Sequence, residues 1–394
     1  MANDPTGTEW IKKLAGMPQK NEAGRQDMED HRELSIFPGL SRRDFLKSCG
    51  TLAALIGLSG PLAAPRVAQA FEEVAMRPRV IWSLFQECLG CSVNLLQSRK
   101  PTPAQLILQQ ISLDYHEAVM APAGDEAEQS FQDTLATDDF FYIVEGAVAT
   151  EIPEAITIHG RTAADIVLEA YQRANATIAI GSCACYGNIQ AAAPNPTGAK
   201  GVADYLRQDA GLSDVTVINS PRCPGNAEDT IAILAYVLVH NELPELDSFG
   251  RPLFLFDETV HDNCERRGHF DNGRFVERFG DEASEKRWCL YKVGCKGPVT
   301  HAPCPKTKWN GEISWPVEAG PCIGCSEPDF WDKLTPFYDK ESGIRLPGDI
   351  TPTQIGVTLG AATAIGIGAH AVGQVAKGRF GRGGPVAGKE ETEE

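Results

Sequence analysis

Cysteine is the residue type with which this sequence could do most of its chemistry. The 394 residues include 12 cysteines, and cysteine at this density in a long chain requires disulfides, metal ligation or redox chemistry. A first group of four follows three separate apolar runs: Cys88, Cys91, Cys183 and Cys223. Four thiolates that meet in space can hold a tetrahedral zinc ion or a cubane iron–sulfur cluster.

Two further groups lie after residue 250. One combines an imidazole with three thiols: His261, Cys264, Cys289 and Cys295. The other has three thiols only: Cys304, Cys322 and Cys325. A three-thiol set suits a cluster that lacks one iron, whereas a closed zinc site requires a fourth ligand. Cys49 and Cys185 belong to no group, and we expect Cys185 to be a small buried side chain or a free thiol.

The elements that must position the first group are four short runs rich in β-branched residues. Residues 79–85, 141–144, 176–180 and 215–218 read as strands, and residues 163–175 as one of the helices between them. This alternation predicts an open parallel α/β sheet. Ligands bind beyond the carboxyl ends of such strands, and the first, third and fourth runs lead directly into the four cysteines. Structural zinc or disulfides remain the alternative, since an exported protein could contain either.

The two ends of the chain carry targeting signals. Residues 1–70 contain Arg42-Arg43, an apolar segment and Ala68-Gln69-Ala70, which predicts a twin-arginine signal peptide cleaved after Ala70. A cytosolic helix with two chance arginines is the alternative. Residues 355–376 lack charged side chains and would span about 33 Å as a helix, enough to cross a membrane. A buried, glycine-rich core helix or a loosely ordered tail is the alternative there.

Charge patterning agrees with this topology. Lys377, Arg379 and Arg382 follow the apolar segment, so the positive-inside rule places residues 377–394 in the cytoplasm and the main body outside. His370 is the ionisable residue of the segment, and ionisable groups inside a membrane are candidates for function. The formal net charge of −17 argues against a nucleic-acid partner.

Ordered motifs run through nearly the whole chain. They are Glu87-Cys88-x-Gly90-Cys91, residues 113–117 (LDYHE), 144–146 (VEG), 181–184 (GSCA), 194–198 (PNPTG), 261–264 (HDNC), 315–317 (WPV) and 322–328 (CIGCSEP). With these motifs the sequence resembles the small, electron-transferring subunits of membrane-bound nickel–iron hydrogenases.

This resemblance implies a flavodoxin-like domain over residues 71–250, a cluster domain over residues 251–348 and three iron–sulfur clusters in a line. The proximal 4Fe–4S cluster would take Cys88, Cys91, Cys183 and Cys223, facing a nickel–iron site in a separate large subunit. The medial 3Fe–4S cluster would take Cys304, Cys322 and Cys325, with Pro316 near its vacant corner. The distal 4Fe–4S cluster would take His261, Cys264, Cys289 and Cys295.

The resemblance also assigns roles at the edges of this electron path. His370 matches a position that can ligate haem b in a membrane cytochrome partner, although a histidine that only hydrogen-bonds is the alternative. Glu87 could lie on a proton path at the boundary with the large subunit, or form an ordinary salt bridge or N-cap. Gly90 and Asn188 occupy the positions at which oxygen-tolerant members carry extra cysteines, so we expect a standard proximal cluster and an oxygen-sensitive enzyme. Val93 and Leu89 depart from the family pattern.

The sequence therefore predicts the small subunit of an uptake hydrogenase on the periplasmic side of the inner membrane. It would carry electrons from hydrogen oxidation to a cytochrome b or similar acceptor. A one-cluster subunit like that of respiratory NADH dehydrogenase is one rival, but it would need only the first four cysteines. A zinc-stabilised exported binding module is the other.

Overall fold

The computed structural model describes residues 77–99, 101–107, 111–240, 242–309, 311–314, 318, 320–338 and 352–377. It divides into two compact units, residues 1–340 and residues 341–394, and each is described by itself. The predicted signal peptide, residues 315–317 with Pro316, and the predicted tail beyond Lys377 lie outside the described residues.

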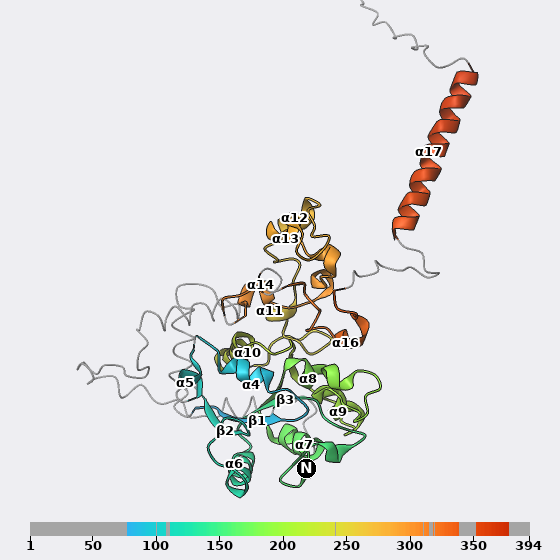
Figure 1. The fold of residues 1–394 in the computed structure, drawn as a ribbon. Coiled ribbons are helices and arrows are strands. Elements are labelled where there is room, and N and C mark those ends of the chain that lie inside the picture. Colours follow the sequence, from blue (N-terminus) through green and yellow to red (C-terminus); the bar gives the residue numbers. More distant parts are fainter. Residues whose placement is uncertain are drawn as a thin grey trace, which may run out of the picture. The chain divides into compact units, whose positions relative to one another are not determined.

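A five-stranded parallel sheet forms the centre of the first unit (Figure 1). Its strands, in spatial order, are β2 (Ser112–His116), β1 (Arg79–Leu84), β3 (Phe141–Glu145), β6 (Ala176–Ile180) and β7 (Ile218–Ser220). Numbered along the chain within this sheet, the order is 2-1-3-4-5, that of flavodoxin-like folds. The predicted parallel α/β sheet is thus confirmed. A separate two-stranded hairpin joins β4 (Thr157–Ile158) to β5 (Arg161–Thr162).

The central strands are apolar along their whole length because both faces of the sheet are covered. On β1, Ile81 belongs to the core of one face, whereas Val80 and Trp82 belong to that of the other. Helices α6 (Asp125–Leu135), α7 (Ala163–Arg173) and α9 (Val202–Gln208) contribute to the first core. Helices α4 (Gly90–Leu95), α5 (Pro103–Gln105) and α10 (Ala227–His240) flank the second.

Three elements differ in detail from the prediction. Strand β2 was not predicted, because it lies at the sheet edge and carries polar Asp114 and His116 among its five residues. The last strand begins at Ile218 rather than Val215, because its pairing with β6 begins at Ile178 and Ile218. Helix α7 ends at Arg173, two residues before the predicted end.

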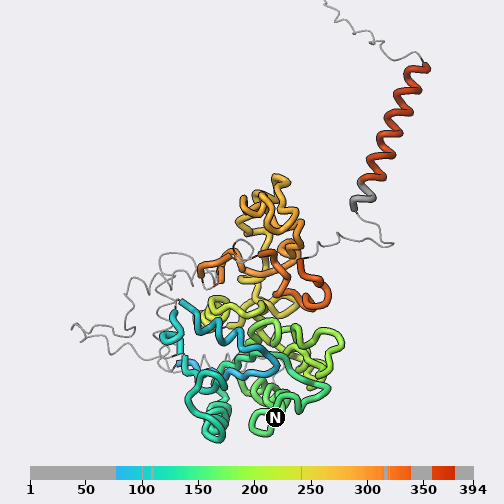
Figure 2. Tube along the Cα trace, viewed as in Figure 1, coloured from blue at the N-terminus to red at the C-terminus, as the bar shows by residue number. Residues whose placement is uncertain are grey.

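Residues 242–338 are mostly irregular, as their composition predicts. Figure 2 shows their yellow and orange trace gathered on one side of the blue and green trace of the sheet. The described elements are short: α11 (Leu253–Phe256), α12 (Arg267–Asp271), α13 (Glu282–Glu285), η4 (Tyr291–Val293), η5 (Gly297–Val299), α14 (Cys304–Thr307) and α16 (Phe330–Lys333). This segment belongs to the same compact unit as the sheet, and the domain boundary near Arg251 stays a prediction.

The described part of the second unit is helix α17 (Pro352–Ala376). Within it, residues 357–376 are long and apolar enough to cross a membrane, with a mean hydropathy of 1.3, and none of their side chains is buried. His370 lies on this helix, with its Nε2 atom 3.3 Å from Gln374 Nε2.

Candidate metal centres

The fold brings the first cysteine group together at the carboxyl ends of three strands. Cys88 and Cys91 lie in the loop after β1 and in α4, Cys183 in α8 (Gly181–Tyr186) after β6, and Cys223 directly after β7. The side-chain amide of Asn188 donates to both Cys183 Sγ, at 3.1 Å, and Cys223 Sγ, at 3.4 Å. The convergence predicted from the strand ends is therefore present.

The backbone around these thiols leaves no room for larger residues. A Cβ added to Gly181 would lie 2.4 Å from Cys91 Sγ, and one added to Gly90 would lie 3.1 Å from Cys88 Sγ. Gly181 also has a φ of +75°, which favours glycine for its own sake. The backbone at Gly90 and Gly181 thus lies close to the sulfur atoms, and a side chain there would collide with them or crowd them.

These thiols accept hydrogen bonds, and they form no disulfides in the described part of the chain. Gly225 N–H donates to Cys91 Sγ at 3.2 Å, and burial raises the pKa of Cys91, while that of Cys183 rises to about 11. Mutual repulsion among the four thiolates contributes to these pKa shifts. Thiolates that repel one another and accept hydrogen bonds are suited to a positively charged metal group, which fits an iron–sulfur cluster.

A buried polar network that the sequence analysis missed holds α4 in place. Glu145, the last residue of β3, accepts from the N–H groups of Cys91 and Ser92, both at 3.0 Å, and from the Ser92 hydroxyl at 2.6 Å. His116 Nε2 lies 3.1 Å from Ser92 Oγ. Because Ala118 N–H donates to His116 Nδ1, the Nε2 atom carries the proton and donates to the serine. The sequence signal that could have revealed this network is Glu145, an acidic residue at the end of a buried strand.

Stability is expected to fall as the pH drops from 6.5 toward 4, in part because of His116. Burial lowers the pKa of this fully buried imidazole to about 4, so in that window the unfolded chain binds a proton that the folded chain does not. The contribution is at most about 1.4 kcal/mol per pH unit. Urea unfolding midpoints of the complex between pH 7 and 5 measure the slope, and His116→Gln should flatten it.

His159→Gln is the control, because His159 is exposed and pairs with the exposed Asp125. An H116Q profile as steep as that of the unchanged protein would contradict the assignment.

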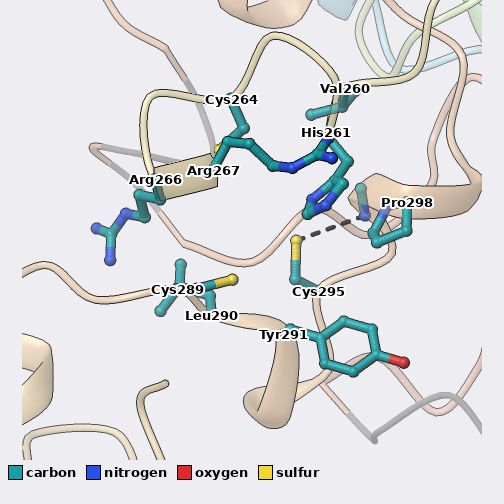
Figure 3. Close-up of a pocket in the computed structure, with 11 residues that line it drawn as sticks. Val260, His261, Cys264, Arg266, Arg267, Cys289, Leu290, Tyr291, Cys295 and Pro298 are labelled. Carbon is teal, nitrogen blue, oxygen red and sulfur yellow. Dashed lines mark hydrogen bonds between the residues drawn. The ribbon is translucent and has the colours of Figure 1, made fainter. Parts of the chain in front are cut away.

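The group formed by His261, Cys264, Cys289 and Cys295 lines a cavity of about 370 Å³, counting its opening to solvent. In Figure 3 the His261 ring and the sulfur atoms of Cys289 and Cys295 point toward one another, and Arg266 points away. Cys295 Sγ accepts from Gly297 N–H at 3.4 Å. Burial and then the Arg267 charge lower the pKa of His261, which favours the neutral imidazole that ligates metals.

The three-cysteine group lies between the other two. Cys322 is 7% exposed, and repulsion by the thiolates of Cys304 and Cys325 adds to burial in raising its pKa. Cys304 begins α14, and Cys325 lies in the loop before α16.

Hydrogen bonds join the three groups in a row. Ser182, which precedes Cys183, donates its hydroxyl to the Cys325 carbonyl and accepts from Arg222 N–H at 3.2 Å. Lys296, which follows Cys295, donates its N–H to the Cys322 carbonyl at 2.8 Å. Each end group therefore contacts the central one through residues that themselves belong to, or adjoin, the groups.

The remaining candidates have plainer surroundings. Within the described part of the chain, no three His, Cys, Asp or Glu side chains are arranged to hold a single metal ion. Cys185 is buried, as predicted, and donates to the Ala179 carbonyl at 3.3 Å. Burial and then the Glu145 charge raise the pKa of Glu87 to about 7. Its buried Oε2 atom has no hydrogen-bond partner among the described residues.

Comparisons with known proteins show the family of the chain. The C-terminal family model of the NiFe/NiFeSe hydrogenase small subunit matches residues 256–338, and that of the NADH ubiquinone oxidoreductase 20 Kd subunit matches residues 88–237. The periplasmic NiFe hydrogenase small subunit 1 of Nitratidesulfovibrio vulgaris is 48% identical over 76% of this chain and 94% of that relative. The quinone-reactive Ni/Fe-hydrogenase small chain of Wolinella succinogenes is 42% identical over 85% of this chain and 96% of its own length.

Solved structures show the same likeness. The NiFeSe hydrogenase of Desulfomicrobium baculatum aligns with a TM-score of 0.62 and 36% identity, covering 67% of this chain and all of that one. The actinobacterial-type NiFe-hydrogenase of Ralstonia eutropha H16 aligns with a TM-score of 0.60 and 28% identity, over 74% and 91% of the two chains.

Proposed function

This chain belongs to the small subunits of nickel–iron hydrogenases, and from that membership we propose that it carries electrons through three iron–sulfur clusters held by the three groups described above. The proximal 4Fe–4S cluster is assigned to Cys88, Cys91, Cys183 and Cys223. The medial 3Fe–4S cluster is assigned to Cys304, Cys322 and Cys325. The distal 4Fe–4S cluster is assigned to His261, Cys264, Cys289 and Cys295.

The observation that carries this proposal is the row of hydrogen-bonded junctions. Ser182, next to Cys183, connects the first group to Cys325, and Lys296, next to Cys295, connects the group at the other end to Cys322. Such clusters supply one-electron redox chemistry when bound. The protein residues ligate, exclude water and donate hydrogen bonds to the sulfur atoms, as Asn188 and Gly225 do at the first group.

The two ends of the row suit different partners. Cys88 and Cys223 are exposed, and exposed apolar side chains accompany them on the neighbouring elements: Val93, Leu96 and Ile189. We assign this face to the large subunit with its nickel–iron site. At the other end, a neutral His261 in place of a thiolate makes the group less negative and favours electron exit there.

The proposed acceptor is a membrane cytochrome b. Support comes from α17, whose length and composition allow a span, and from the relative named quinone-reactive. His370 is then a candidate haem b ligand, and Glu87 a candidate for a proton path at the boundary with the large subunit. Export by the twin-arginine route and a periplasmic location remain parts of this proposal, with support from the relatives named periplasmic.

Metal analysis with low-temperature EPR tests the proposal. The membrane-purified complex should contain about eleven irons per small subunit, acid-labile sulfide, and nickel in the large chain. Its oxidised form should show a 3Fe–4S signal, which the Cys304→Ser variant should lose. Zinc without sulfide or nickel would overturn the proposal in favour of an exported zinc-binding module.

A further inference from the structure

A fully buried ion pair lies beside the central cysteine group. The side chains of Arg222 and Asp229 are 3% and 0% exposed, and Arg222 Nη1 lies 2.8 Å from Asp229 Oδ2. The same nitrogen donates to Thr307 Oγ1 at 3.3 Å, and the guanidinium carbon lies 5.7 Å from the centre of the Trp309 ring. Arg222 also directly precedes Cys223, a residue of the first group.

The ion pair has a definite orientation relative to the central cysteine group. Thr307, which accepts the Arg222 hydrogen bond, lies in α14, the short helix that begins at Cys304, and the Arg222 charge acts on the Cys304 thiolate more strongly than the opposing charge of Asp229 does. Its charge also acts on Cys325. The Oδ1 atom of Asp229 has no hydrogen-bond partner among the described residues. The positive end of the pair therefore faces the central group, and the negative end lies behind it.

Stability alone is a poor reason for this arrangement. A buried ion pair costs desolvation free energy that its own attraction often fails to recover, and apolar residues of similar volume can be as stable. The guanidinium of arginine stays protonated in proteins, so Arg222 remains charged beside Asp229. A fixed cation in a dry site stabilises any negative charge that arrives nearby.

We propose that the Arg222–Asp229 pair sets the reduction potential of the medial cluster, with Arg222 raising it and Asp229 moderating that effect. This inference rests on the proposed assignment of Cys304, Cys322 and Cys325 as its ligands. A reduced cluster carries one more negative charge than an oxidised one, and net charge and hydrogen bonds to the sulfur atoms are among the factors that set such potentials. Arg222 therefore acts as a positioning charge on the cluster rather than as a ligand.

Opposite shifts from the two partners make the test specific. Redox titration of the 3Fe–4S EPR signal in the intact complex should give a lower midpoint for Arg222→Gln and a higher one for Asp229→Asn. At the midpoint of the unchanged protein, we expect the ratio of oxidised to reduced cluster to change about tenfold in each case, equivalent to 59 mV for one electron. Arg222→Lys keeps the positive charge, so its midpoint should lie close to that of the unchanged protein.

Two controls separate this effect from general damage. Arg161 pairs with Glu128 and Glu169 and lies over the Phe131 ring, so Arg161→Gln should leave the medial midpoint unchanged. The distal midpoint should also stay constant in every variant. If Arg222→Gln does not accumulate, the upward shift in Asp229→Asn still decides the question. Unchanged midpoints, or shifts of the same sign, would overturn the inference, whereas a missing 3Fe–4S signal in the unchanged complex would overturn the proposed function itself.

Discussion

Replacement of Gly181 by alanine is expected to prevent binding of the proposed proximal cluster. An added Cβ would lie 2.4 Å from Cys91 Sγ, a separation that real Cβ atoms do not adopt, and Gly181 leads directly into Cys183. The thiol cannot yield without leaving the group, because it is buried against Ile180 and Gly225. The complex should lose about four irons per small subunit, as measured by iron and sulfide analysis.

Gly160→Ala is the matched control. Gly160 has a φ of +77°, close to the +75° of Gly181, but nothing lies within 4 Å of its added Cβ. It should cost only the backbone strain of an L-residue in the left-handed region, about 1–2 kcal/mol, and retain all its iron. Full iron content in Gly181→Ala, or equal iron loss in both variants, would show that the thiol group does not require this close approach.

Removal of iron from the intact complex is expected to unfold residues 261–295 while the sheet persists. The elements described in this stretch are at most five residues long, and its apolar cluster has only three buried members, Val276, Leu290 and Val293, whereas Leu255, Phe256 and Val260 belong to a core of the sheet. A stretch with so small a core of its own would depend on the proposed cluster, as small metal-binding domains do. The cost of opening it should therefore fall sharply when the clusters are lost.

Hydrogen exchange before and after anaerobic chelation measures this dependence. The Val276 amide, which donates to the Cys289 carbonyl at 2.9 Å, should lose at least about a hundredfold in protection, equivalent to about 2.7 kcal/mol. Amides of the central strand β3 are the internal control and should keep their protection. Equal loss in both regions would indicate a single cooperative unit, and no loss at Val276 would indicate that side-chain packing suffices.

The sheet could be predicted because its central strands are buried on both faces. Continuous apolar runs such as residues 141–144 and 176–180 are recognisable as buried strands. The carboxyl ends of parallel strands meet at one edge of the sheet, so the cysteines that follow such strands were expected to lie together there. Strand β2 escaped prediction because an edge strand tolerates polar residues such as Asp114. Its apolar content alone does not distinguish it from a loop.

Site positions were easier to predict than the contacts that support them. The three cysteine groups follow from residue type and spacing, with the ligand sets themselves supplied by resemblance. Residue type and spacing do not predict the network of Glu145, Ser92 and His116, because it joins residues from three separate segments. The row of groups rests on hydrogen bonds to the backbone carbonyls of Cys325 and Cys322, which any amino-acid type could supply. Only tertiary structure reveals such contacts.

Unequal burial of the thiols has a consequence for biogenesis. Cys88 and Cys223 are exposed in the isolated chain, whereas Cys322 is buried. A newly made small subunit that waits for its partner is thus most open to oxidants and competing metals at the face assigned to the large subunit, and its middle is shielded by its own fold. Pairing of the subunits before exposure to air would cover the exposed thiols Cys88 and Cys223. The order of assembly would then protect all three cysteine groups.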